Sequence, residues 1–407
     1  MTSMNELRIV TLAGDPDREA DLAREIDERR DVELVLRCVD RVEFLAALRS
    51  DAVDAIVSVG APSWFAKQEA FEASQAGIVV VGLVKNAPDA DRLAELGAGL
   101  LPVEAPVQEV IDRCRSSEPL PAPAQPAFHS NGDRGRLIAV WGPKGAPGRT
   151  RVAIELGAEL AAGEPSTVVI DGDPYGGDVL QMLGIVEELP SIVWAARLAA
   201  RGQLDNIRLV EDLRRTGRDG PVVLPGLPRA ELWADVSEFG WRSLLDVTGS
   251  SFRYAVCDVG FCIETAPSYS GTAEGRNRMA IATLQAADTV IAVCRADPVG
   301  LKNFVWTFEH LRELVADESI RIVANRVRRS EESQVGDVLR KHIGRRPAAY
   351  IPDIPSEVNR ALLLGRSLKE AGLSSAGGGS FEALAVSLGG RIRPRGLLAR
   401  LSGKAQR

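Results

Sequence analysis

A run of apolar residues, LIAVWG, leads directly into the glycine-containing segment PKGAPGRT, and RVAIELGAELAA follows it with helical spacing. A strand, a glycine-containing loop and a helix in immediate succession bring backbone N–H groups and the positive end of the helix dipole to one point. That point suits an anion such as a phosphate, and a parallel sheet covered by helices normally supports it. The segment from Trp141 to Thr150 therefore predicts a phosphate-binding loop in an α/β fold.

Further apolar runs surround this loop between Arg136 and about Leu388. Most are continuous rather than alternating, as in parallel strands that are buried on both faces. Helical stretches separate them, which predicts a large doubly wound domain with a parallel sheet. The expected strands span residues 136–142, 166–173, 220–226, 254–260, 289–295, 320–325 and 347–352.

Polar side chains close several of these runs. Asp171 and Asp173 end one strand in VVIDGD, Asp258 ends another in YAVCDVG, and Asn325 ends a late strand in IVAN. The carboxyl ends of parallel strands meet at one crevice of a doubly wound sheet. We therefore expect these residues to face a nucleotide that carries a metal ion.

Taken together, loop and strand ends resemble the MinD/ParA deviant Walker P-loop ATPases, whose loop reads roughly xKGGxGK[ST]. The resemblance covers most of residues 136–388, including PDIPSEVNRALLLGRSL, which is similar to a late proline-rich turn and helix of that family. It implies ATP and Mg²⁺ as cofactors. The implied catalytic residues are Lys144, which reaches across a dimer to the partner's nucleotide, and Asp173, which positions the attacking water. The implied metal-binding residues are Thr150 and Asp258, and the implied nucleotide-binding residues are Gly145, Ala146, Pro147, Gly148, Arg149, Thr150 and Asn325.

Three positions depart from the family pattern. Arg149 replaces the ordinary Walker lysine, Ala146 replaces the second glycine, and Pro147 fills the variable position. A guanidinium is planar and wider than an ammonium, and proline removes one backbone N–H from the loop. One lost donor to a charged group costs roughly 1.5 to 3 kcal/mol, or around tenfold to a hundredfold in affinity. We therefore expect weak nucleotide binding and slow or absent hydrolysis. Taken singly, Asp173, Asp258 and Asn325 are equally explained as turn or cap residues.

The first 117 residues alternate five short β-type runs with amphipathic helical stretches, such as Glu19 to Arg30. The order resembles a response-regulator receiver domain, and the chemistry does not. Ser58 and Val59 stand where a receiver carries its phosphorylated aspartate, and Leu101 followed by Pro102 stands where it carries a lysine before proline. Asp15 and Asp17 either mimic the acidic metal pair or serve as a turn and helix cap. We predict an unphosphorylated pseudo-receiver, a domain typical of the TadZ/CpaE branch of the MinD/ParA proteins.

Composition marks two other segments. Residues 118–135 are rich in proline and alanine and predict a semi-extended linker. Residues 389–407 form a basic tail in which Leu397, Leu398 and Leu401 lie among arginines. In MinD-type proteins a short basic amphipathic helix at this place binds anionic membrane, and the tail looks similar; the alternative is a solvated basic tail. The basic runs RVRRS and KHIGRR are either solvated faces or contacts to DNA phosphates.

The net charge, the cysteines and the length of the apolar runs limit the partners and the location that we expect. A formal net charge of −7 disfavours a large nucleic-acid footprint, so DNA is not the expected partner. The five cysteines are expected to be buried reduced thiols. With no signal peptide and no apolar run of about 20 residues, the chain is expected in the cytoplasm, with the tail as a candidate contact with the inner face of the plasma membrane.

The sequence thus predicts a homodimeric, ATP-binding localisation factor that positions a pilus-assembly or septum machine at the inner membrane. The alternatives are an active ATPase of the same family and a ParA-like DNA-partitioning protein.

Overall fold

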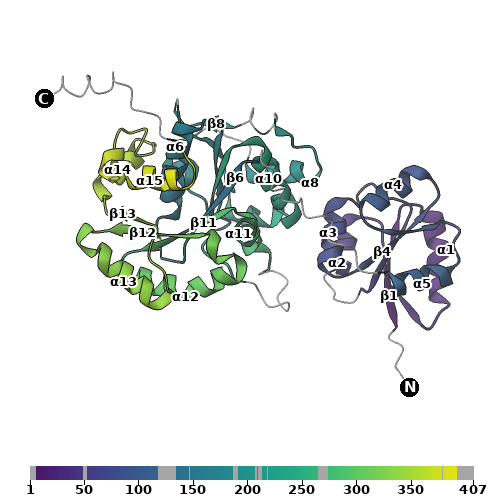
Figure 1. Ribbon diagram of the computed structural model, residues 1–407. Coiled ribbons are helices and arrows are strands. Elements are labelled where there is room, and N and C mark those ends of the chain that lie inside the picture. Colours follow the sequence, from purple (N-terminus) through teal and green to yellow (C-terminus); the bar gives the residue numbers. More distant parts are fainter. Residues whose placement is uncertain are drawn as a thin grey trace. The chain divides into compact units, whose positions relative to one another are not determined.

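The computed structural model describes residues 6–48, 53–117, 134–145, 147–186, 191–206, 209, 213–217, 219–264, 274–377 and 379–391. The chain divides into two compact units, Met1–Ala127 and Phe128–Arg407 (Figure 1). Each unit is described by itself.

The smaller unit is built around one five-stranded sheet in which every neighbouring pair of strands is parallel. Its strands are β1 (Leu7–Ala13), β2 (Val32–Cys38), β3 (Ala55–Val59), β4 (Val79–Val84) and β5 (Gly99–Pro102). Its helices are α1 (Pro16–Asp27), α2 (Arg41–Leu48), α3 (Lys67–Gln75), α4 (Ala87–Glu95) and α5 (Val107–Ser116). The strand order β2-β1-β3-β4-β5 is that of flavodoxin-like doubly wound domains.

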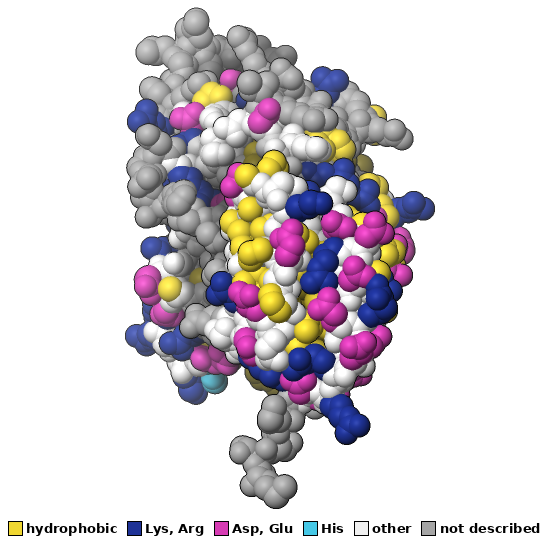
Figure 2. All heavy atoms as spheres, turned by 90° about the vertical axis from the view of Figure 1, so that its right-hand side faces the viewer, with side chains coloured by type: hydrophobic (Ala, Val, Ile, Leu, Met, Phe, Trp, Pro, Cys, Tyr) yellow, Lys and Arg dark blue, Asp and Glu magenta, His cyan; other side chains and the backbone are white. Residues whose placement is uncertain are grey.

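Two apolar layers cover this sheet, because its inner strands carry β-branched side chains on both faces. Ile9 and Val57 pack with α1 and α5, whereas Val10 and Ile56 pack with α2, α3 and α4. Figure 2 looks onto the α1 and α5 side of the unit, where basic and acidic side chains are interspersed over the helices. Ion pairs such as Arg18 with Glu25 lie among them.

The residues at receiver-type positions make local contacts. Ser58 is fully buried, and its hydroxyl donates to the carbonyl oxygen of Gly60 at 2.7 Å. Asp15 is the N-cap of α1, where its carboxylate accepts the N–H of Arg18 at 3.3 Å. Of the two functions considered for Asp15, the cap is the one found.

The larger unit is built around an eight-stranded sheet with the order β13-β12-β11-β6-β10-β7-β9-β8. Its strands are β6 (Arg136–Trp141), β7 (Thr167–Gly172), β8 (Arg214–Arg215), β9 (Val222–Leu224), β10 (Tyr254–Val259), β11 (Thr289–Arg295), β12 (Ile320–Val327) and β13 (Ala349–Pro352). Its α-helices are α6 (Arg149–Gly163), α7 (Val179–Met182), α8 (Ile192–Ala200), α10 (Glu238–Ser251), α11 (Glu274–Ala286), α12 (Pro298–Leu314), α13 (Glu332–Ile343), α14 (Pro355–Leu363) and α15 (Ser380–Ser387). Short 3-10 helices are η1 (Ala230–Asp235), η2 (Asp317–Ser319), η3 (Arg329–Glu331) and η4 (Ser374–Gly377).

Every neighbouring pair in this sheet is parallel except β8 with β9, so the predicted α/β fold with a parallel sheet is confirmed. The sequence pattern did not predict β8, a two-residue edge strand. Helices α6, α14 and α15 cover one face of the sheet, and α8 and α10 to α13 cover the other (Figure 1). Strand β6 serves both layers, since Leu137 and Trp141 face one and Val140 faces the other.

Strand β6 is also the point at which the order of the strands along the sheet reverses. The chain runs from β6 to β7 on one side, and β11 is hydrogen-bonded to its other side. In open α/β sheets the crevice for a ligand opens at such a switch point, beyond the carboxyl ends of the strands. The loop after Trp141 leaves β6 at this point.

The end of the described chain is attached to the same unit. The hydroxyl of Tyr254 donates to the carbonyl oxygen of Gly389 at 2.8 Å, and Arg136 donates to that of Leu388 at 2.9 Å. The predicted tail beyond Arg391, with Leu397, Leu398 and Leu401, lies outside the described residues, as does most of the predicted linker 118–135. None of the described helices combines the length and the apolar character needed to cross a bilayer.

Candidate functional site

The loop between β6 and α6 follows a tight path that depends on glycine. Gly145 and Gly148 have φ angles of 107° and 91°, and Gly148 is the residue from which α6 starts. Such φ angles favour glycine over other residues. A Cβ at Gly142 would lie 2.5 Å from the carbonyl oxygen of Val293, and one at Gly148 would lie 2.5 Å from the side-chain nitrogen of Asn325. The loop therefore passes close to β11 and β12 before it turns into the N-terminus of α6.

The first turn of α6 contacts the end of β10. The hydroxyl of Thr150 donates to Oδ2 of Asp258 at 2.6 Å. Asp258 is fully buried, and its other oxygen, Oδ1, has no hydrogen-bond partner among the described residues. Burial raises the pKa of Asp258 to about 8, with Asp171 adding to the rise and Arg149 opposing it. A buried oxygen without a donor beside a hydroxyl fits either a proton or a bound cation.

The two aspartates after β7 have different surroundings. Asp171 accepts the backbone N–H groups of Asp173 and Val179, at 3.4 and 3.2 Å, and so closes the turn that follows the strand. A Cβ at Gly177 would lie 2.0 Å from its carboxylate oxygens, so this turn has no room for a side chain there. Burial raises the pKa of Asp171 to about 7. We interpret Asp171 as a residue that shapes the turn.

Asp173 faces the loop instead. Its Oδ1 accepts the N–H of Tyr175 at 2.9 Å, and its Oδ2 lies 3.1 Å from Nη2 of Arg149. The two side chains of this ion pair are only 13% and 10% exposed, for Arg149 and Asp173 respectively. The predicted water-positioning carboxylate is thus engaged by the residue that replaces the Walker lysine.

Arg149 makes a second contact, with the start of the loop. Its Nη1 donates to the carbonyl oxygen of Gly142 at 3.0 Å, and its guanidinium carbon lies 6.0 Å from the ring centroid of Phe261. Its Nε is buried without a hydrogen-bond partner in the described part of the chain. The guanidinium therefore connects the start of the loop at Gly142 with Asp173 after β7. Its Nε–H group remains without an acceptor among the described residues.

Asn325 joins the loop to the neighbouring strand. Its side-chain Nδ2 donates to the carbonyl oxygen of Pro147 at 2.7 Å, and its Oδ1 accepts the N–H of Arg326 at 2.9 Å. Arg326 has a φ of 57°, and the register with β13 shifts at this point, so the strand forms a bulge. Bulges redirect side chains, and this one accompanies the turn of Asn325 toward the loop. Its amide is committed to the protein backbone, which leaves the predicted contact with adenine a hypothesis.

Lys144 stands apart from these contacts. Its side chain is exposed and makes no hydrogen bond or ion pair within the described ranges. Its backbone carbonyl accepts the side-chain amide of Asn303 at 3.3 Å, which fixes the loop against α12. An exposed lysine at the outer end of the loop is available to a ligand or a second chain.

The structure thus connects Arg149, Thr150, Asp173 and Asp258 through direct contacts or shared neighbours, and it places Gly148, Pro147 and Asn325 beside them. Ala146 lies outside the described residues. Among the residues described, no group of three or more His, Cys, Asp or Glu side chains is arranged to hold a metal ion, so Thr150 and Asp258 would leave most ligand positions to water or substrate.

Three groups that contact Arg149 or the loop were not predicted from the sequence: the carbonyl oxygen of Gly142, the ring of Phe261 and the side-chain amide of Asn303. Only Phe261 carried a signal, since it directly follows the strand end that contains Asp258. Of the cysteines, Cys38, Cys114, Cys257 and Cys294 are buried, as expected, while Cys262 is half-buried, and all five are free thiols.

No protein-family model matches the chain, and no curated protein matches it. Solved structures similar to it are MinD/ParA-type P-loop ATPases. A ParA family ATPase from Chlorobium tepidum TLS is 20% identical, with 62% of this chain and 98% of that chain covered and a TM-score of 0.49. The septum site-determining protein MinD complexed with Mg-ADP, from Pyrococcus horikoshii OT3, is 19% identical, with coverage of 66% and 99% and a TM-score of 0.49. An ATP complex of an McdA variant from Cyanothece is 17% identical, with coverage of 64% and 100% and a TM-score of 0.48. Similarities this distant transfer no residue roles, and the fold rests on the chain's own strand order and loop.

Proposed function

We propose that the larger unit binds ATP with Mg²⁺ at the loop between Gly142 and Thr150, and that the chain acts as a localisation factor rather than as a fast ATPase. The contact between Thr150 and Asp258 carries this proposal. It joins the first turn of a helix that starts at a left-handed glycine to a buried carboxylate with one oxygen to spare. A hydroxyl and a carboxylate at a helix N-terminus are suited to a magnesium ion that bridges to phosphate oxygens.

The residues present fit such a ligand in part. Thr150 and Asp258 would hold the metal ion, which neutralises phosphate charge when bound. Arg149, with a donor unused at Nε, would supply positive charge to the phosphates, and Lys144 is free to reach a ligand or a second copy of the chain. Two features oppose rapid turnover: Pro147 offers no N–H to the loop, and Arg149 holds Asp173 away from the water-positioning task.

The finer assignment to a platform for a pilus-assembly or septum machine rests on the pairing of two units. The smaller unit has the receiver-type strand order, and the fully buried Ser58 near the end of β3 offers no carboxylate for phosphorylation. A unit that keeps this shape without the chemistry suits protein contact. We propose a homodimer whose smaller units bind pilus or division proteins, with residues 392–407 as a candidate membrane contact.

Calorimetric titration of the full chain with ATP tests the site. Binding should require Mg²⁺, and Asp258→Asn should weaken it at least tenfold in the presence of Mg²⁺ while changing it little in EDTA. Asp178→Asn is the matched control, because Asp178 is an exposed carboxylate on the same loop as Asp173. Magnesium-independent binding, or equal binding by Asp258→Asn and the control, contradicts the proposed site.

Two other assays separate the alternatives. A working ATPase predicts steady turnover that Asp173→Ala abolishes, and a DNA-partitioning protein predicts duplex binding that weakens steeply with added salt. A localisation factor predicts self-association that persists when both assays are negative.

A further inference from the structure

The start of helix α11 is hydrogen-bonded to the loop that carries Asp173. The hydroxyl of Tyr175, two residues after Asp173, donates to Oδ1 of Asn277 at 2.7 Å. Burial raises the pKa of Tyr175 to about 12, with Cys262 adding to the rise, so the phenol keeps its proton at neutral pH and acts as the donor. The loop after β7 is thus joined to α11 at Asn277.

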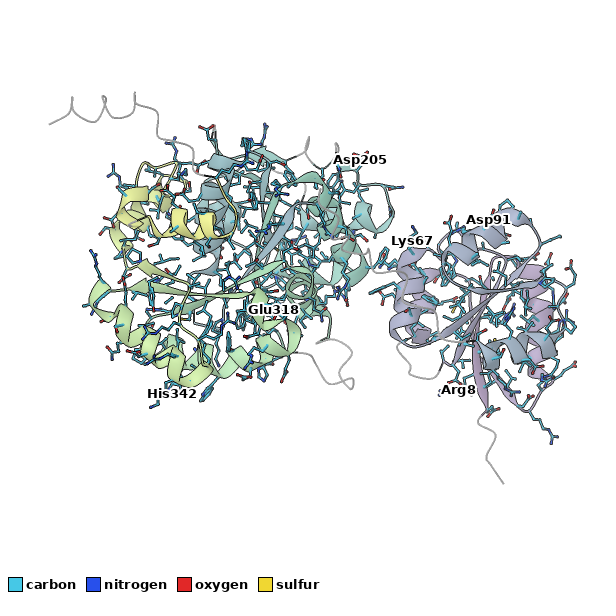
Figure 3. All side chains as sticks on the ribbon, viewed as in Figure 1. Arg8, Lys67, Asp91, Asp205, Glu318 and His342 are labelled. Carbon is cyan, nitrogen blue, oxygen red and sulfur yellow. The ribbon has the colours of Figure 1, made fainter. Side chains whose placement is uncertain are left out.

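Asn277 is itself firmly held. It is 8% exposed, and its Nδ2 donates to Sγ of Cys262 at 3.2 Å and to the carbonyl oxygen of Glu264 at 2.9 Å. Helix α11 is fixed in the core by Met279 and Leu284, and side chains fill the space between this helix and the sheet (Figure 3). A buried amide with all these partners has no reason to turn away, so Asn277 is a fixed point of attachment for Tyr175.

The ring of Tyr175 is held separately from its hydroxyl. Its centroid lies 5.0 Å from that of Phe261, the ring beside the guanidinium of Arg149. On its other side the guanidinium carbon of Arg276 lies 4.2 Å from the ring centroid, and Nη2 of Arg276 donates to the carbonyl oxygen of Pro174 at 3.3 Å. A phenylalanine in place of Tyr175 would keep the ring contacts. The substitution Tyr175→Phe therefore removes the hydrogen bond to α11 with little other change.

The same residue orients the carboxylate of Asp173. The backbone N–H of Tyr175 donates to Oδ1 of Asp173 at 2.9 Å, and the other oxygen, Oδ2, pairs with Arg149 at 3.1 Å. With one oxygen held by the loop backbone, the second is directed to the guanidinium. Carboxylates and phosphates bind the same N–H groups of an arginine, so a guanidinium held by Asp173 is less available to a phosphate.

We propose that Asn277 and Tyr175 are positioning residues that hold Asp173 on Arg149 and thereby lower the affinity of the loop for polyphosphate. This inference rests on the proposed nucleotide site and names a contact that regulates it. Because the contact is made by α11, a movement of this helix that breaks the hydrogen bond would make Arg149 available to the ligand.

Calorimetric titration of the full chain with pyrophosphate and Mg²⁺ tests the two residues. Tyr175→Phe should raise the affinity about twofold to tenfold, the range that one neutral hydrogen bond supplies. Asn277→Ala should raise it similarly, and the double variant should gain no more than the larger single variant, because both remove the same bond. Tyr254→Phe is the matched control. Its hydroxyl donates to the carbonyl oxygen of Gly389 at 2.8 Å, at the start of β10, and its loss should leave the affinity unchanged.

Dependence on Asp173 separates positioning from a general loosening of the fold. In the Asp173→Asn background the ion pair is already absent, so adding Tyr175→Phe should have no further effect on affinity. Unchanged or lower affinity in Tyr175→Phe overturns the proposal, as does an equal rise in Tyr254→Phe or in the Asp173→Asn background. If neither the natural chain nor Asp173→Asn binds pyrophosphate or ATP, the nucleotide site and the positioning roles are both refuted. A gain in Asp173→Asn without one in Tyr175→Phe refutes the positioning roles alone.

Discussion

The ion pair between Arg149 and Asp173 should compete with any polyphosphate that enters the loop. Nη2 of Arg149 lies 3.1 Å from Asp173, and both side chains are nearly buried. The guanidinium cannot pair fully with a phosphate while it remains on this carboxylate. Asp173→Asn removes the charge, keeps an oxygen that can still accept the N–H of Tyr175, and changes the side-chain volume little.

The magnitude follows from the burial of the pair. Removing one partner of a buried ion pair costs about 3–5 kcal/mol when the other charge stays behind without compensation. Arg149 retains the carbonyl oxygen of Gly142, and asparagine offers it a neutral acceptor. These two acceptors compensate part of the charge. We therefore expect the free energy of unfolding of the larger unit to fall by about 2–3 kcal/mol, at or below the lower limit of this range. In the variant this ion pair no longer competes with a bound phosphate, so the affinity for pyrophosphate or ATP should rise by about tenfold to a hundredfold. Each factor of ten corresponds to about 1.4 kcal/mol.

Two measurements on the full chain check this expectation. Denaturant unfolding followed by tryptophan emission reports mainly on the larger unit, because every tryptophan except Trp64 lies in it. Calorimetry gives the affinity for pyrophosphate with and without Mg²⁺. Asp178→Asn is the control, and a double-mutant cycle with Arg149→Met isolates the coupling energy between the two side chains. Unchanged stability in Asp173→Asn, or weaker pyrophosphate binding, would refute the competition.

Three further perturbations test the surroundings of the loop. Burial raises the pKa of Asp258 from its ordinary 3.8 to about 8, so the folded protein holds a proton that the unfolded chain releases between these values; the free energy of unfolding should fall as pH rises through this window, by at most about 1.4 kcal/mol per pH unit for this group, and urea titrations of Asp258→Asn at several pH values should give a smaller slope. Gly148→Ala should lower the unfolding free energy by about 1–3 kcal/mol, since alanine must adopt a φ of 91° with its Cβ 2.5 Å from Asn325, whereas Gly344→Ala has a similar φ but open space and should cost less in the same thermal scans. Asn325→Ala leaves the carbonyl oxygen of Pro147 without its side-chain donor and should cost about 1–3 kcal/mol by denaturant unfolding, while a change no larger than that of Asn359→Ala, at an exposed asparagine of α14, would count against this connection.

Much of the fold could be predicted because its signals are local. Strands such as β10 and β11 are continuous apolar runs, as expected for strands buried on both faces, and Val256 and Val293 lie in the core. The loop was marked by Gly145 and Gly148, whose left-handed backbone other residues avoid. Strand β8 carried no such signal, since two exposed arginines pair only because β9 lies beside them.

The contacts of the site could not be predicted to the same depth. The pairing of Arg149 with Asp173 depends on how two side chains 24 residues apart turn toward each other, which spacing alone does not determine. The hydrogen bond from Asn325 to Pro147 occurs beside a bulge at Arg326. Arginine rarely adopts a left-handed backbone, so the sequence offered no reason to expect the bulge there. By pattern alone Asp171 and Asp173 both close the strand, and only the family resemblance singled out Asp173; their neighbours place Asp171 in the turn and Asp173 beside the loop.

The anchoring of the chain's last described residues has a geometric consequence. Gly389 is held by Tyr254, the first residue of β10, and Leu388 by Arg136, the first residue of β6. At the opposite, carboxyl ends of the same two parallel strands lie Asp258, in the last residues of β10, and Thr150, in the helix that follows β6. The described chain therefore ends at the edge of the sheet opposite the loop, so a contact made close to Arg391 would leave the loop accessible to a second molecule. Shortened proteins used to study that contact should retain Arg391, because ending the chain at Leu388 would also remove the carbonyl that Tyr254 binds.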